Sequence, residues 1–98
     1  MKSTRLPRRI HLGLSYTVEV VLASQTIIRD IMELDDDDRS RFDGCWVSHL
    51  GDNTYKGQFI VAGVIYVDRS LSAVSRMNTY WHELGHALID IRDFSLGL

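Results

Sequence analysis

The sequence predicts one α+β domain in which a short twisted β-sheet is backed by one helix and a second helix lies at the C-terminal end. Three observations predict this class. The chain has 98 residues, the size of a single domain. Apolar residues alternate with polar ones early in the chain and mix with turn residues in its middle, as they do in strands. Two further segments carry apolar residues at helical spacing, so residues 1–98 are treated as one domain.

The first expected element is a strand or a pair of strands. Apolar side chains occupy every second position from Ile10 to Leu22, a period of two that is typical of one or two half-buried strands. Residues 1–9 precede this pattern and contain four basic side chains, and we expect them to form a basic flexible tail.

A helix is expected next, with Ser24 as its N-cap. Four aspartates in a row, at positions 35–38, follow the helical pattern. Acidic groups are unfavourable at a helix C-terminus, so the helix is expected to end by Leu34 and the aspartates to form a solvated loop. The apolar stripe of this helix consists of Ile27, Ile28, Ile31 and Met32.

Residues 43–68 change to β-type residues and turn markers, which predicts a hairpin. Its strands are expected around 45–47, 59–61 and 64–67, with a turn at 51–53. A final helix then begins after Ser70 or Ser72 as N-cap and continues through Ile91, with Gly97 beyond its end.

Composition excludes several classes of function. Eleven Lys and Arg against thirteen Asp and Glu give a formal charge of −2, whereas a general binder of nucleic acid or membrane surfaces carries an excess of positive charge. Cys45 is the only cysteine, so an intrachain disulfide and a CxxC clip are excluded, and we expect a small buried side chain there. His11 and Glu19 interrupt the stretch after the basic start, and no apolar run approaches the roughly 18–20 residues of a membrane span. A cytoplasmic or particle-bound protein without a signal peptide is expected.

The C-terminal helix contains His82-Glu83-Leu84-Gly85-His86, an HExxH motif. At about 100° per residue, the two histidines lie about 40° apart and one turn apart along the helix, so both imidazoles can contact one ion. Glu83 lies about 60° from His86, where its carboxylate reaches a water on the ion rather than the ion itself. The sequence therefore predicts a Zn²⁺ site with His82 and His86 as ligands and Glu83 as the general base.

The alternative is a solvated helix face that contains these letters by chance. The flanking positions argue against it, because 79–81 and 87–88 are uncharged. Gly85 costs about 1 kcal/mol relative to alanine inside a helix, so we expect another backbone or a substrate to approach closely there.

Residues 79–88, Thr-Tyr-Trp-His-Glu-Leu-Gly-His-Ala-Leu, resemble the active-site helix of the zincin metallopeptidases. Residues 63–72 resemble the strand and turn that lead into this helix in small phage and bacterial HELGH peptidases and, more distantly, in SprT-like proteins. The resemblance implies a minimal zincin-like domain that hydrolyses peptide bonds with Glu83 as proton carrier. It also implies that the strand around 64–67 is an edge strand that pairs with an extended protein or peptide substrate. Phage structural proteins are further partners, and a virion-associated location is then expected beside a cytoplasmic one.

A catalytic zinc takes three protein ligands and a water, so a third ligand is needed. The metzincin pattern requires a glycine at position 89 and a ligand at 92, where this chain has Ile89 and Arg92. The metzincin subclass is therefore disfavoured. The gluzincin pattern requires an acidic residue further downstream than the sequence extends.

Asp90 is the expected third ligand, because it lies about 40° from His86 on the same helix face and about 6 Å further along. Its alternative role is to orient a ligand imidazole from outside the coordination shell. Other sources of the ligand are Asp93, His49, His11 or a partner chain.

Three functions compete on this basis. The first is a zinc metalloendopeptidase, encoded by a phage or mobile element. The second is a non-catalytic structural component of a virion or its tail, in which zinc stabilises a small core. The third is a nucleic-acid-associated module whose basic N-terminal segment contacts DNA, which the net charge disfavours.

Overall fold

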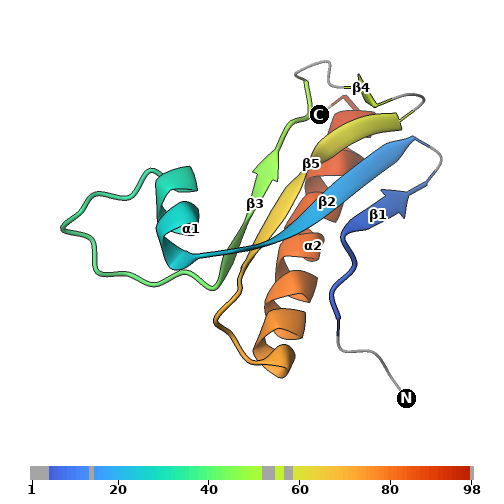
Figure 1. The fold of residues 1–98 in the computed structure, drawn as a ribbon. Coiled ribbons are helices and arrows are strands. Elements are labelled where there is room, and N and C mark those ends of the chain that lie inside the picture. The colour runs from blue at the N-terminus through green and yellow to red at the C-terminus, as the bar shows by residue number, and fades with distance from the viewer. Residues whose placement is uncertain (1–4, 14, 52–54, 57–58, 98) are drawn as a thin grey trace.

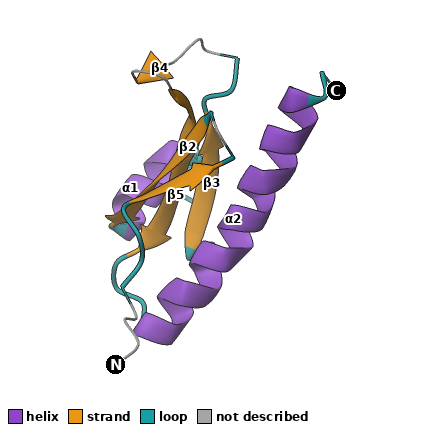
Figure 2. Cartoon of the chain, turned by 90° about the vertical axis from the view of Figure 1, so that its right-hand side faces the viewer, coloured by secondary structure: helices purple, strands orange, loops and turns teal. Residues whose placement is uncertain are grey.

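The computed structural model describes residues 5–13, 15–51, 55–56 and 59–97, which form an α+β fold as expected (Figure 1). The C-terminal helix packs on the β-sheet, and α1 lies against the opposite face (Figure 2). In chain order the elements are β1 (Arg9–Leu12), β2 (Tyr16–Ala23), α1 (Gln25–Ile31), β3 (Gly44–Ser48), β4 (Tyr55–Lys56), β5 (Phe59–Asp68) and α2 (Ala73–Ser95).

The sheet has the strand order β1-β2-β5-β3, and the short β4 pairs with the beginning of β5. Antiparallel pairing joins β1 to β2 and β3 to β5, whereas β2 and β5 run parallel. Parallel neighbours need a crossover, and here α1 and β3 lie between β2 and β5 in the chain. As a result β5 is central, while β1 and β3 form the two edges.

The main core lies between the sheet and α2, and a smaller cluster lies under α1. Cys45 belongs to the smaller cluster and is buried, as expected. Burial raises the pKa of its thiol, and the negative charge of Glu83 raises it further, so the thiol stays protonated and unreactive at neutral pH. The main cluster comprises Val18, Val20, Ala62, Ile65, Val67, Tyr80, Leu84 and Ile91.

Several boundaries differ from the expected ones. The early period-two pattern forms two strands, and Gly13, whose φ of 63° suits glycine, lies in their connection. The predicted tail over residues 1–9 is wrong at its end: Arg9 pairs with Glu19, and Val20 N donates to Arg8 O at 3.0 Å. Residues 1–4 of that tail lie outside the described residues.

Two predicted strands, at 59–61 and 64–67, form one continuous strand, β5. The reason is that every position except Ala62 has a partner in β2, β3 or β4, and Ala62 O accepts a hydrogen bond from His49 N just beyond β3. The predicted turn at 51–53 lies mostly outside the described residues. Among the helices that the structure describes, none has the length and apolar character needed to cross a bilayer.

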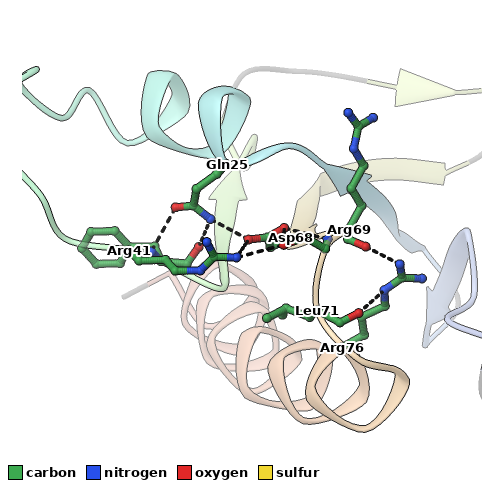
Figure 3. A network of polar contacts seen from close by, with 8 residues as sticks. Gln25, Arg41, Asp68, Arg69, Leu71 and Arg76 are labelled. Carbon is green, nitrogen blue, oxygen red and sulfur yellow. Dashed lines mark hydrogen bonds and ion pairs between the residues drawn. The ribbon is translucent and has the colours of Figure 1, made fainter.

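Asp68, at the end of β5, connects α1, the loop before β3 and the loop before α2 (Figure 3). Its side chain is 1% exposed. Oδ2 accepts from Gln25 Nε2 at 2.7 Å and Arg41 Nη2 at 2.6 Å, and Oδ1 accepts from both the amide and the hydroxyl of Ser70 at 2.8 Å. Burial raises the pKa of this carboxyl, but the hydrogen bonds and the Arg41 charge outweigh burial and hold the pKa below its ordinary value.

Replacing Asp68 by asparagine is expected to lower the free energy of unfolding at neutral pH by about 1–3 kcal/mol, because charged acceptor bonds are lost. The folded pKa of Asp68 is lowered, so its stabilisation is complete above the unfolded pKa of about 4 and is lost as pH falls through the folded pKa. Urea unfolding of both chains at pH 7 and pH 3 checks this. The difference between the chains should narrow at the lower pH, and an equal difference at both would contradict it.

Candidate metal centre

Helix α2 carries the HExxH motif in its middle, and its two ends are well defined. Ser72, and not Ser70, is the N-cap, since its Oγ accepts from Ser75 N at 3.2 Å. The buried face sets the rotation of the helix on the sheet, so that Glu83 turns inward while His82 and His86 are exposed beside it. That face consists of Tyr80, Glu83, Leu84, Ala87 and Ile91.

The two imidazoles lie beside each other, with one ring nitrogen of each within hydrogen-bond distance of the other. Nε2 of His82 and Nε2 of His86 are 3.2 Å apart, and the ring planes are inclined by 83°. Two nitrogens bound tetrahedrally to zinc at 2.0–2.1 Å would be about 3.3 Å apart. The spacing of the two nitrogens is therefore close to the one that a tetrahedral ion requires.

Glu83 completes a group of three side chains whose ligand atoms lie within 4.8 Å of one another. Its side chain is only 8% exposed. Burial raises the pKa of its carboxyl, and the neighbouring His86 and His82 lower it by less. A carboxylate whose pKa is raised is a stronger base than an exposed one, which suits it to accept a proton and to return it.

A groove of about 370 Å³ opens beside this group. One wall is the segment 41–44, which leads into β3, and the other is formed by Asn78, Thr79, His82 and Glu83 of α2. A Cβ at Gly44 would lie 2.6 Å from Thr79 Cγ2 and 2.5 Å from the backbone oxygen of Tyr66. Glycine at this position therefore lets β3 approach α2 closely enough to form the groove.

The expectation that the strand around 64–67 is a substrate-binding edge strand is wrong. Val64 pairs with Glu19 of β2 on one side and with Val47 of β3 on the other. Its backbone groups are therefore used within the sheet. The period-two pattern does not show which strand is central, because sheet order depends on pairing between distant segments.

The edge strand next to the metal centre is β3. Asp43 O accepts from Asp68 N, and His49 N donates to Ala62 O, so the odd-numbered residues of this segment bond toward β5. In an antiparallel ladder the residues in between direct their N–H and C=O groups the other way. The free edge of β3 therefore presents the backbone groups of Gly44, Trp46 and Ser48.

The structure does not bring Asp90 into the group of His82, Glu83 and His86. Instead, Trp46 Nε1 donates to Asp90 Oδ2 at 2.6 Å and ties α2 to β3. The sequence offers no signal for this contact, because its two residues are 44 positions apart. Asp90 as the third ligand stays a prediction.

The other candidates for the third ligand also lie outside the group, within the part of the chain that the structure describes. Asp93 Oδ1 accepts from Arg92 at 3.0 Å. His49 follows β3, and His11 Nδ1 is 3.5 Å from Thr17 Oγ1 near the opposite edge of the sheet.

The expected close approach of another backbone at Gly85 is wrong. No atom of the described residues, beyond the helix's own backbone and the neighbours in the chain, lies within 4 Å of a Cβ built there. The approach of a substrate at this position stays a prediction.

Comparison of the chain with known protein families, curated proteins and solved structures found no match. The resemblance of the motif to the zincins is therefore not tested by these comparisons.

Proposed function

We propose that this chain is a zinc-dependent metallopeptidase. The observation that carries the proposal is the 3.2 Å spacing of the two Nε2 atoms beside a buried carboxyl, next to a groove that His82 and Glu83 line. His82 and His86 would hold the ion, since neutral imidazole is a preferred zinc ligand. Both lie on one rigid helix, so the pair needs little rearrangement to bind.

Bound zinc supplies a water of lowered pKa and polarises the scissile carbonyl. Glu83 takes a proton at its carboxylate and passes it to the leaving amine. The edge of β3 holds an extended peptide by backbone hydrogen bonds to Gly44, Trp46 and Ser48, next to the groove that contains Glu83. Recognition through backbone groups makes the sequence preference loose, and a protein or peptide is the expected substrate.

Zinc removal tests this function. We expect one zinc ion per chain by calorimetric titration, a rise in thermal stability on binding, and cleavage of an unfolded protein such as labelled casein that stops with a chelator and returns with zinc. His82→Ala and His86→Ala should each weaken zinc binding by about 100-fold or more, beyond the 10- to 100-fold typical of residues that only orient ligands.

His11→Ala is the matched control, because this histidine lies in β1 at the opposite edge of the sheet from the metal centre, and it should leave zinc affinity unchanged. Asp90→Asn in the same titration tests the third ligand. A loss of zinc affinity as large as that of the histidine variants supports coordination by Asp90. Unchanged zinc affinity means that Asp90 only accepts the hydrogen bond from Trp46. Absence of zinc binding at neutral pH would refute the proposal. Zinc binding without cleavage would favour the alternative, a zinc-stabilised structural component.

A further inference from the structure

A second groove lies at the opposite edge of the sheet from the metal centre. It has a volume of about 990 Å³ and is enclosed by residues 5–9, the end of β2 and the first turn of α2. The metal centre adjoins β3, whereas this groove adjoins β1 and β2, and the central strand β5 separates the two edges. The two grooves are therefore distinct sites.

The walls of this groove are strongly basic. Four arginines and one glutamate line it, an excess of three positive charges in a chain whose formal charge is −2. The guanidinium of Arg76 donates to the main-chain oxygens of Arg69 and Leu71, which hold it in place without neutralising its charge (Figure 3). The four arginines are Arg5, Arg8, Arg9 and Arg76, and the acid is Glu19, 4.0 Å from Arg9.

The floor of the groove contains an open strand edge. Val20 N donates to Arg8 O on the β1 side of β2, and Ala23 O accepts from Arg69 N on the β5 side. Since these directions alternate along a strand, the N–H and C=O of Leu22 face the β1 side. β1 stops pairing with β2 before Leu22, and on that side of β2 no main-chain group of the described residues bonds to Leu22.

The same stretch exposes apolar side chains. Val21 is 38% and Leu22 is 42% exposed, although both belong to a strand. Open backbone groups, partly exposed apolar side chains and a basic rim together match an extended polypeptide with acidic side chains. We propose that this groove binds an acidic extended segment of a partner protein, which pairs with Leu22 and continues the line of β1.

The acidic loop of a second copy of this chain does not fit this role. Arg29 donates to the main-chain oxygens of Asp35, Asp38 and Ser40 and holds that loop in a folded shape. The Asp38 carboxylate also accepts from Ser40 N at 2.8 Å. A loop that is closed in this way cannot lie extended along β2.

The test uses a fluorescein-labelled peptide of alternating glutamate and valine, and fluorescence anisotropy on the chain that carries Glu83→Gln, so that cleavage cannot consume the probe. We expect Arg8→Glu to weaken binding by about tenfold or more, because the substitution places a negative side chain beside the acidic peptide and like charges repel. Arg39→Glu, which makes the same change of net charge outside the groove, should leave binding unchanged. Circular dichroism confirms that both variants are folded.

Two probe controls separate the charge from the backbone contribution. A lysine–valine peptide, and a glutamate–valine peptide N-methylated at alternate residues, should each bind at least about tenfold more weakly. In NMR titration the amide signals of Leu22 and Ala73 should shift, because both residues line the groove.

Four outcomes would overturn the proposal: no binding, equal binding of the lysine peptide, shifts confined to Trp46 and Thr79, or tighter binding of an oligothymidylate than of the acidic peptide. Shifts at Trp46 would place the peptide in the metal-centre groove. Failure of zinc binding leaves this test unaffected, so the two proposals can fail separately.

Discussion

Replacement of Glu83 by glutamine is expected to lower the rate of peptide hydrolysis by about 100- to 10,000-fold, the range for loss of a positioned general base. Glutamine has nearly the same shape and fills the same buried position, but its amide accepts no proton. His82 and His86 are unchanged, so zinc affinity should be retained. Cleavage of labelled casein and the zinc content of the purified chain measure the two quantities.

Asp30→Asn is the matched control, because Asp30 is an exposed acid of α1, which lies on the opposite face of the sheet from α2. It should retain both cleavage and zinc. If Glu83→Gln instead loses zinc as strongly as His86→Ala, Glu83 is itself a ligand and the proposed proton carrier is wrong. If it cleaves as fast as the unaltered chain, the metallopeptidase mechanism fails.

Replacement of Gly63 by alanine is expected to have the largest effect on stability. A Cβ at this position of the central strand would lie 2.2 Å from Val47 O and 2.6 Å from Trp46 Cη2. The backbone of β3 has to shift, and overpacking of this kind typically costs about 1–3 kcal/mol, with more expected here because the obstacle is main chain. The shift also moves Trp46, which bonds to Asp90. The urea midpoint measures the loss.

Gly85→Ala is the matched control, the same substitution at a helical position with open space around the new Cβ. It should stabilise the fold by up to about 1 kcal/mol, because alanine favours the helix. Equal stability of Gly63→Ala and the unaltered chain would show that β3 does not pack against Gly63 as described. The pair of variants separates a steric effect from a general intolerance of glycine replacement.

Local patterns in the sequence predict much of the fold. The apolar alternation before Ala23 predicts β1 and β2, and the serines at 24 and 72 are the observed N-caps. These features depend on residues a few positions apart, which is the range over which periodicity and capping act. The predicted tail was wrong at Arg8 and Arg9, because a basic composition does not show that main-chain groups pair with β2.

The candidate zinc ligands could be identified from the sequence alone, because two histidines one helical turn apart meet on one face wherever that helix lies. The sequence does not show that β3 is the edge beside them, that Trp46 bonds to Asp90, or that four arginines line one groove with the end of β2; these features appear in the folded chain. The two kinds of feature depend on interactions over different distances along the chain. A helix sets its spacing through neighbours within one turn, whereas strand order and side-chain contacts across the sheet depend on which distant segments pair and bury each other.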